Sequence, residues 1–492
     1  MITKNLARLA LLAFAISTFA AEPAASPDQN RARTTRIENG LLPAVIVKGE
    51  PRPTMSISDR MAHYKVPGVS IAVINNGAIE WAAGYGVTEA GQSPPVTAET
   101  IFQAASISKP VFAMGALSLV EKRQLDLDED VNLKLKSWKV PANEFTKEKK
   151  VTLRTLLNHS AGTTVHGFRG YGADEPVPSL LDVLDGRKPP ANSDPVRVDT
   201  VPGTKWRYSG GGITIAQLLV MDVSGKPFPQ FMRETVLDKL GMNQSTYEQP
   251  LPKDWTARAA AAHDRSGAIV KGRWHTYPEA AAAGLWTTPA DLALFAIEIQ
   301  NARAGKSNQV LSRTMTAEML EPIRGGFGLG IESKGKGRSA TFSHGGSNEG
   351  FRTQMFAYLE TGQGAVVMTN GENGSPLIDE IMRGIAAEYG WPDYKVGERA
   401  IAKIDPKLYA SYAGEYRTRN SSLNVAVEGD RLFVKADPLG PDRLELLPES
   451  ETKFFVTAAD VAFTFRKDES GKVTEIVVEP ASASPVTAKR VN

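Results

Sequence analysis

Residues 101–120 read IFQAASISKPVFAMGALSLV, and this stretch decides the predicted fold. After a short apolar lead-in, apolar residues recur at three- and four-residue steps from Val111 onward, which predicts a helix. Pro110 is tolerated only in a first helical turn, so we expect the helix to begin close to Ser106, a residue type suited to a helix N-terminus. Ser106 and Lys109 then share one helix face, and their side chains can meet.

A serine with a lysine three residues later is typical of active-site serine acyl transferases. A helix N-terminus also favours the negative charge that develops on an attacked carbonyl. The alternative is a capping serine followed by a surface lysine, and the segment alone leaves both open. A second match, SKGK at residues 333–336, lies in a Gly- and Lys-rich stretch that is not expected to be helical. The spacing therefore occurs by chance as well. Ser108, beside Lys109, is expected to point elsewhere.

Two further short motifs follow at wide spacing. They are Tyr208-Ser209-Gly210 and His344-Gly345-Gly346. Residues 163–203, between the first and second motifs, are rich in Gly, Pro and Asp. This segment is long for a structureless loop, so it is interpreted as a lid or a wall of the site.

The N-terminus predicts export. Residues 1–20 carry Lys4 and Arg8 ahead of a mostly apolar run, Leu9–Phe19, that is too short to span a bilayer. We interpret them as a signal peptide that is cleaved before Ala21. The mature protein is then expected to be exported, with the bacterial periplasm as its expected location, and to have no stable membrane anchor.

Composition excludes several classes of function. Lys4 and Arg8 are the only charged residues among the first 20, so the mature chain has 55 basic and 55 acidic residues and no charge excess that would attract nucleic acid. The chain has no cysteine, which excludes disulfides, a thiol nucleophile and thiolate metal sites. Its six histidines show no metal-ligand spacing. We expect a small-molecule or peptide substrate, no metal and no cofactor; the oligomeric state stays open.

The chain divides near residue 400. A hairpin is predicted where residues 69–74 and 79–81 flank Asn75-Asn76-Gly77, and residues 364–369 read as a late buried strand. Strands at both ends with helices between them predict an α/β sandwich with a helical insertion. Later residues alternate with period two between frequent turns, which predicts an antiparallel, barrel-like β domain. The predicted parts are a lead-in (21–55), the α/β domain (56–395), a linker (396–404) and the β domain (405–492).

Several other segments sit in the order of a known family. They are LLNHSAG (156–162), Pro202-Gly203, AGLWTTPADL (283–292), Phe351-Arg352 and Thr369-Asn370-Gly371. Together with the three motifs, they resemble the serine hydrolases related to class C β-lactamases and D,D-peptidases, the penicillin-recognising fold, over about residues 55–390. From YAGEY (412–416) onward, the chain resembles the lipocalin-like β domain of some D-aminopeptidase relatives.

The resemblance implies roles for named residues. Ser106 attacks a carbonyl and forms an acyl-enzyme, while Lys109 and Tyr208 share the general-base work. The backbone N–H groups of Ser106 and Ser347 form the oxyanion hole. The implied substrate-binding residues lie along the third motif and beside the tyrosine: Gly210, His344, Gly345, Gly346 and Arg352. His159 is expected to have a structural role at a helix end.

Two departures from the family pattern bear on the substrate. Gly210 stands where β-lactamases have an asparagine, and His344 replaces a lysine that carries a nearly permanent charge. A histidine is mostly neutral at pH 7 unless its pKa is raised, so Arg352 is the candidate for the missing anion contact. Esterase or D-specific amidase and peptidase activity is therefore favoured over strong β-lactamase activity. The alternative from another class is a penicillin-binding or peptidoglycan-sensing module that is acylated without efficient turnover.

Overall fold

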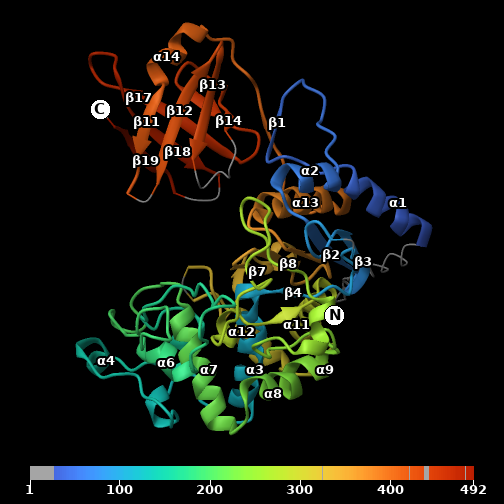
Figure 1. The fold of residues 1–492 in the computed structure, drawn as a ribbon, viewed down its shortest axis with the longest axis vertical. Coiled ribbons are helices and arrows are strands. Elements are labelled where there is room, and N and C mark those ends of the chain that lie inside the picture. The colour runs from blue at the N-terminus through green and yellow to red at the C-terminus, as the bar shows by residue number, and fades with distance from the viewer. Residues whose placement is uncertain are drawn as a thin grey trace, which may run out of the picture.

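The computed structural model describes residues 27–92, 94–323, 325–419, 421–436, 443–481 and 484–491. The predicted signal peptide lies outside these ranges. Figure 1 shows two bodies, a large mixed one below and a smaller one built of the C-terminal strands above, joined near strand β1. No helix within the described ranges combines the length and the apolar character needed to cross a membrane.

The large body is built on a six-stranded antiparallel sheet in the order β3-β2-β9-β8-β7-β6. The strands are β2 (Gly68–Asn75), β3 (Ala78–Gly86), β6 (Glu332–Lys334), β7 (Thr341–Asn348), β8 (Phe351–Tyr358) and β9 (Gly364–Thr369). The predicted hairpin is confirmed, because Asn76 and Gly77, with φ of 53° and 74°, turn β2 into β3. The N-terminal strands pair with the late strand β9, as the sandwich prediction requires.

Helices cover both faces of this sheet. On one face lies α13 (Gly374–Tyr389), with α1 (Pro27–Glu38) and α2 (Ile57–Tyr64) packed against it. On the other lies α11 (Pro289–Arg303), which contacts β2, β3, β8 and β9. Val69, Ile71 and Val73 of β2 face the first layer, and Ala72 and Ile74 face the second. A strand buried on both faces is continuously apolar, and β2 reads that way.

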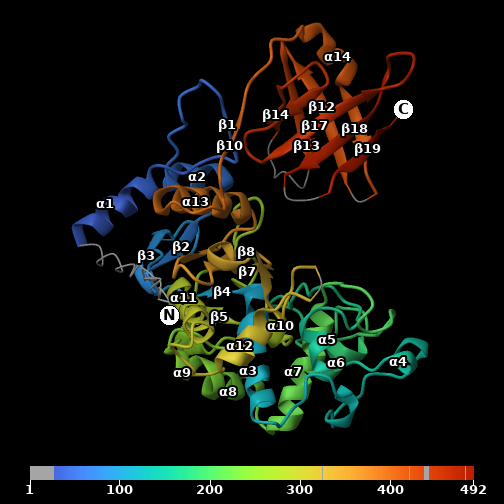
Figure 2. The same ribbon diagram turned by 180° about the vertical axis from the view of Figure 1, so that it is seen from behind.

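The helical insertion surrounds α3 (Ser108–Glu121), which is buried along nearly its whole length. Figure 2 shows α3 beside α7 (Gly210–Ser224) and α10 (Ala280–Ala283). The remaining elements of this body are α4 (Glu144–Glu148), α5 (Leu153–Leu157), α6 (Leu180–Asp185), α8 (Phe228–Met232), α9 (Asp238–Leu240), α12 (Arg313–Leu320), the 3₁₀ turns η1 (Ala105–Ile107), η2 (Val131–Leu133), η4 (Lys253–Arg258) and η5 (Gly337–Ser339), the π-helical turn η3 (Arg233–Leu237), and the paired strands β4 (Phe102–Gln103) and β5 (Trp286–Thr287).

The C-terminal body confirms the antiparallel, barrel-like prediction. Its nine-stranded sheet begins with β14 and ends with β15, which Leu446 alone separates in the chain, so the barrel is nearly closed. Aromatic side chains such as Tyr416, Phe454 and Phe463 fill its core. Its elements are η6 (Pro406–Leu408), α14 (Tyr409–Tyr412), β11 (Gly414–Arg417), β12 (Ser422–Glu428), β13 (Arg431–Ala436), β14 (Leu444–Glu445), β15 (Leu447–Pro448), β16 (Lys453–Phe455), β17 (Val461–Lys467), β18 (Val473–Pro480) and β19 (Val486–Arg490).

The segment predicted as a linker takes part in regular structure. Within it, β10 (Gly397–Arg399) pairs in parallel with β1 (Val45–Val47), which belongs to the predicted lead-in. The backbone N–H of Val45 donates to Thr457 of the β domain over 3.0 Å. Arg399 donates to Asp460 over 2.8 Å. The connection between the two bodies is therefore itself hydrogen-bonded.

Candidate active site

Ser106 lies in η1, a tight turn that leads into the buried helix α3. Ala105, directly before it, has a φ of +50°, in the left-handed region that residues other than glycine rarely adopt. The 3₁₀ turn occupies Ala105–Ile107, so α3 begins at Ser108, two residues later than the sequence predicts. Ser106 is therefore held in a constrained turn rather than capping the helix.

Ser108 braces this turn. Its hydroxyl is fully buried, donates to the carbonyl oxygen of Ala105 over 2.5 Å, and accepts from the backbone N–H of Leu285 over 2.9 Å. The expectation that Ser108 points away from Lys109 agrees with these contacts. The side chain therefore has a structural role, which its position next to Lys109 in the sequence did not indicate.

Lys109 reaches back to Ser106, as helical spacing predicts. Its Nζ lies 3.0 Å from Ser106 Oγ and donates to the carbonyl oxygen of Ala282 over 2.7 Å. The residue is only 2 % exposed, and its Nζ lies 4.9 Å from the centre of the Tyr208 ring. The structure thus brings together the three residues predicted to act as nucleophile and bases.

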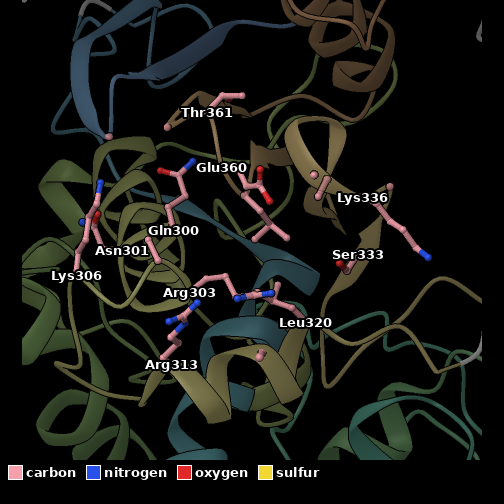
Figure 3. A pocket seen from close by; sticks show the side chains of 18 of the residues that line it. Gln300, Asn301, Arg303, Lys306, Arg313, Leu320, Ser333, Lys336, Glu360 and Thr361 are labelled. Carbon is pink, nitrogen blue, oxygen red and sulfur yellow. The ribbon is translucent and has the colours of Figure 1, made fainter. Parts of the chain in front are cut away.

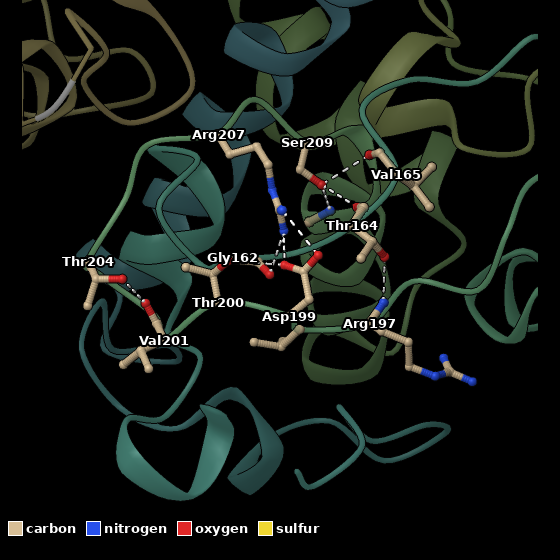
Figure 4. A network of polar contacts seen from close by, with 12 residues as sticks. Gly162, Thr164, Val165, Arg197, Asp199, Thr200, Val201, Thr204, Arg207 and Ser209 are labelled. Atoms are coloured by element: carbon tan, nitrogen blue, oxygen red, sulfur yellow. Dashed lines mark hydrogen bonds and ion pairs between the residues drawn. The ribbon is translucent and has the colours of Figure 1, made fainter. Parts of the chain in front are cut away.

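The two residues that flank Tyr208 in sequence, Arg207 and Ser209, are fixed by polar contacts (Figure 4). Ser209 caps α7, because its Oγ accepts from the N–H of Gly212 over 3.0 Å, and the same hydroxyl donates to Thr164 O over 2.8 Å. On the other side, the guanidinium of Arg207 pairs with Asp199 and donates to Gly162 O. The segment predicted as a lid or wall therefore fixes the backbone around the tyrosine.

Histidines surround the Tyr208 ring. The ring of His159 stacks on it at 4.4 Å between centroids, His166 lies at 5.0 Å and His344 at 6.2 Å. His159 is buried, which lowers its pKa well below the usual value, and its Nδ1 accepts from the N–H of Ser209 over 3.3 Å. His159 lies just after the end of α5, and its structural role includes the positioning of Tyr208.

The third motif lies on the part of β7 that β6 leaves uncovered. Pairing with β6 ends at Ser343, so the edge from His344 to Ser347 has no strand beside it on that side among the described residues. A side chain at Gly346 would place its Cβ 2.3 Å from Ala104 O. Only glycine lets this edge approach the turn that carries Ser106, as a shared oxyanion hole requires. The pairing of the N–H groups of Ser106 and Ser347 on one oxygen stays a prediction.

His344 is a neutral side chain in this setting. It is 5 % exposed, and burial together with the positive charge of Lys109 lowers its pKa to about 3. Its Nδ1 lies 2.7 Å from Gly345 O, so this nitrogen carries the proton and Nε2 is an acceptor, with no protein partner among the described residues. Contact with substrate stays a prediction, but burial and the charge of Lys109 both disfavour a positive charge on His344 at neutral pH.

The two other predicted substrate contacts have defined neighbours. Gly210 begins α7 and donates to His166 O over 2.9 Å; a Cβ here would lie 3.0 Å from the ring of Phe168. An asparagine would require the Phe168 ring to shift by a few tenths of an ångström. Arg352 forms an ion pair with Glu372 and donates to Asn348 O over 2.7 Å. These bonds occupy the guanidinium and disfavour its prediction as an anion contact.

Sequence reasoning missed two buried polar residues next to the site. Asn348 donates to Gln103 Oε1 over 2.7 Å and to Ala283 O over 3.0 Å, which ties the end of β7 to α10. Glu279 begins α10, and burial raises the pKa of its carboxyl to about 8. A lone Asn or Glu carries no motif, so no signal in the sequence could have found them. No cluster of His, Asp and Glu suited to a metal ion occurs in the described ranges.

Comparison with known protein families assigns the chain to one of them. The family described as Beta-lactamase matches residues 56–387, which is more than half of the chain. The protein belongs to this β-lactamase family of serine hydrolases and penicillin-binding proteins. Residues 398–489 match a domain of unknown function, DUF3471.

Several curated relatives are similar over much of their length. Penicillin-binding protein 4* of Bacillus subtilis is 25 % identical over 450 residues, covering 84 % of this chain and 93 % of that protein. A D-aminopeptidase of Brucella anthropi is 22 % identical over 434 residues, covering 84 % of this chain and 76 % of that protein. Esterase EstB of Burkholderia gladioli is 25 % identical over 214 residues, covering 42 % of this chain and 53 % of that protein.

Solved structures share the fold. The octameric penicillin-binding protein homologue from Pyrococcus abyssi matches with a TM-score of 0.60 at 22 % identity, covering 88 % of this chain and 98 % of that chain. The D-amino acid amidase from Ochrobactrum anthropi SV3 matches with a TM-score of 0.55 at 21 % identity, covering 68 % and 97 %. The predicted α/β fold is thereby confirmed.

Proposed function

We propose that the protein hydrolyses an amide, peptide or ester bond through an acyl-enzyme on Ser106. The observation that carries this proposal is the buried contact of 3.0 Å between Lys109 Nζ and Ser106 Oγ. This lysine is withdrawn from solvent and also held by the carbonyl of Ala282, so its Nζ is fixed beside the serine hydroxyl. Membership of the β-lactamase family supports the same chemistry.

In the proposed reaction, Ser106 Oγ attacks the substrate carbonyl and passes its proton to the base formed by Lys109 and Tyr208. The oxyanion is stabilised by the N–H groups of Ser106 and Ser347. The leaving amine or alcohol receives the proton as its bond to the carbonyl carbon breaks. Water then attacks the carbonyl carbon of the acyl group and gives a proton to the same base. The base returns a proton to Ser106 Oγ as the acyl group leaves.

The proposed substrates are esters and D-amino acid amides or peptides rather than β-lactams. The β-lactamase pattern uses an amide two residues after the tyrosine and a lysine in the third motif, and this chain has Gly210 and a neutral His344 there. Relatives named D-aminopeptidase and esterase support this choice. The second candidate is a penicillin-binding or peptidoglycan-sensing module that keeps its acyl group, which relatives named as penicillin-binding proteins support.

Time-resolved mass spectrometry separates these candidates. The purified protein is incubated with a fluorophosphonate and, separately, with a penicillin, and Ser106→Ala serves as the control. A hydrolase is labelled by the fluorophosphonate at Ser106, and any penicilloyl adduct disappears with time. A penicilloyl adduct that persists for hours supports the sensor candidate. Labelling of Ser106→Ala to the same extent would refute both.

We also propose that the protein is exported after removal of residues 1–20, to a bacterial periplasm, where it meets small-molecule or peptide substrates. The basic start and short apolar run of this segment support the proposal. Cell fractionation followed by N-terminal sequencing tests it, and a mature chain beginning at Ala21 is expected. A cytoplasmic protein that keeps Met1 would overturn it.

A further inference from the structure

The short helix α10 holds the amine of Lys109, because the carbonyl oxygen of Ala282 accepts from its Nζ over 2.7 Å. This helix is a run of four alanines, which have no side chain long enough to anchor it. A single helical turn is also not stable by itself. Glu279, at the N-cap position, makes no side-chain cap. The place of the Ala282 carbonyl therefore depends on groups that other elements supply.

Gln217 of α7 grips the start of α10. Its Oε1 accepts from the backbone N–H of Ala281 over 2.8 Å, and its Nε2 donates to the carbonyl oxygen of Pro278 over 3.2 Å. The side chain is 3 % exposed, so water has little access to these bonds. One amide thus supplies the cap that Glu279 does not make, and it comes from the helix that follows Tyr208.

Asn348, at the end of β7, holds the other end of α10, because its Nδ2 donates to the carbonyl oxygen of Ala283 over 3.0 Å. The helix is thereby connected to the elements that carry all three motifs. It is linked to α3 through Lys109, to α7 through Gln217 and to β7 through Asn348. A change at any of these contacts would move the carbonyl that holds the lysine.

The Ala282 carbonyl restricts how the amine of Lys109 can rotate. When one N–H points at this oxygen, the nitrogen lone pair of the neutral amine can be directed at Ser106 Oγ, 3.0 Å away, to take its proton as Oγ attacks the substrate carbonyl. We propose that Gln217 is a positioning residue for this step, acting through α10 on the orientation of Lys109. The inference rests on the function proposed above for Ser106 and Lys109.

Fluorophosphonate labelling of Ser106 in two backgrounds tests the proposal. Gln217→Met has a similar length and volume but forms neither bond, and it should slow labelling about tenfold or more. In a Lys109→Ala background, the same substitution should change the rate less than about twofold, because no amine is left to orient. Intact-protein mass spectrometry measures all four rates. Equal slowing in both backgrounds would overturn the proposal, as would a wild-type rate in Gln217→Met.

Gln300 of α11 provides the matched control. It is 5 % exposed, and its Nε2 donates to Tyr358 O over 2.8 Å and to Gln363 O over 3.1 Å, so it is also a buried glutamine that holds backbone. It lies in the wall of a cavity of about 780 Å³ whose lining contains neither Ser106 nor Lys109 (Figure 3). Gln300→Met should lose comparable stability in urea and label at the wild-type rate. Slowing like that of Gln217→Met would attribute the effect to lost stability and overturn the proposal.

The pH dependence of labelling is a readout that a loss of packing alone would not move. A carbonyl that accepts from an amine favours its protonated form. Loosening Ala282 should therefore shift half-maximal labelling to lower pH in Gln217→Met, and Gln300→Met should keep the wild-type midpoint. An unchanged midpoint in Gln217→Met would contradict action through the amine.

A milder variant covers the case in which Gln217→Met does not fold, which circular dichroism detects. Gln217→Asn shortens the side chain by one methylene, so its amide cannot reach both Pro278 and Ala281, and the same tests apply to it. The outcomes also separate this inference from the proposed function. An unlabelled wild type would refute the function proposed for Ser106. Normal labelling of the wild type without an effect at Gln217 would refute only the positioning role.

Discussion

The two Ser-x-x-Lys segments of this protein have the same spacing and opposite structures. At residues 106–109 a 3₁₀ turn passes into a buried helix, and the lysine Nζ lies 3.0 Å from the serine Oγ. At residues 333–336 a strand ends, Gly335 takes a φ of +77°, and Lys336 is exposed. The spacing puts two side chains together only where the backbone is helical between them.

Burial separates the two segments further. Around the first, Ser108, Ala282 and Tyr208 hold a half-buried serine and a buried lysine in place. Around the second, the lysine ends in solvent at the rim of a polar cavity. A nucleophile therefore needs the scaffold as much as the motif.

The largest effect is expected from the serines themselves. Ser106→Ala should abolish fluorophosphonate labelling and hydrolysis, because among the described residues no other side-chain hydroxyl hydrogen-bonds to Lys109 Nζ. Ser333→Ala should change neither. Intact-protein mass spectrometry measures the labelling, and circular dichroism verifies folding. Labelling of Ser106→Ala at the wild-type rate would mean that another residue is the nucleophile.

The lysines make the second contrast. Lys109→Ala and Tyr208→Phe should each slow acylation by about 10²-fold or more, the usual worth of general acid–base catalysis. Lys336→Ala should have no effect on acylation. If Lys109 and Tyr208 act as one unit, as proposed, the double variant should be little worse than either single variant. Stopped-flow acylation rates measure this, and losses that add fully in free energy would show two separate tasks.

Ser108 tests the brace under the nucleophile. Ser108→Ala leaves the N–H of Leu285 without its partner and removes one of the two donors to the carbonyl of Ala105, so we expect a loss of about 1–3 kcal/mol in the free energy of unfolding, with slower labelling of Ser106. Ser118→Ala is the matched control, since Ser118 is buried on the same helix but donates only within it, to Gly115 O. Urea unfolding should show a smaller loss there and unchanged labelling. Identical behaviour of the two variants would contradict the idea that Ser108 braces the turn that carries Ser106.

Much of this arrangement could be predicted from sequence because it depends on local patterns. The hairpin at Asn76-Gly77, the apolar run of β2 and the late strand β9 follow from turn chemistry and periodicity. The helical spacing of Ser106 and Lys109 follows in the same way. Tyr208 and His344 could be found only as members of an ordered family set, since neither residue type marks a site by itself.

The rest depends on contacts between distant segments, which no local pattern encodes. The 3₁₀ turn η1 packs against β7 and α10, so neither the positive φ of Ala105 nor the two-residue delay of the helix was visible in the sequence. The burial that keeps His344 neutral and the ion pair that occupies Arg352 involve partners far along the chain. Glu279 owes its raised pKa to burial alone.

Glu279 gives a pH-dependent test of α10, the short helix whose carbonyl holds Lys109. Burial raises its pKa from 4.5 to about 8, so the folded protein binds more protons than the unfolded chain between these values. Stability should therefore fall as pH rises through this window, by at most about 1.4 kcal/mol per pH unit.

The neighbouring Tyr171 and Tyr277 have raised pKa values and stay neutral throughout that window. Glu279→Gln removes the titration, so its unfolding free energy should depend less steeply on pH between 5 and 8 than that of the wild type. Urea titrations at several pH values measure the slopes. Parallel slopes would mean that Glu279 is ionised in the folded protein.

The smallest effect concerns His344, which stands where the family has a lysine. With a pKa of about 3 it stays neutral from pH 5 to 8, so the ratio of activity on a carboxylate-bearing D-peptide to activity on a neutral ester should show no step near pH 6.5 that arises from His344. His344→Lys should raise that ratio about fivefold, the worth of roughly 1 kcal/mol from one partly solvated charge contact.

Two neighbours limit the gain from His344→Lys. The positive charge of Lys109, which lowers the pKa of His344, would also oppose a second ammonium there, and Gly210 supplies no amide. The conservative variant His344→Gln keeps a neutral polar side chain and should leave the ratio unchanged. Steady-state kcat/KM values for both substrates measure it across the pH range. If His344→Lys and His344→Gln give the same ratio at every pH, His344 does not set specificity, and the residues of the 163–203 wall around His166 and Phe168 become the candidates.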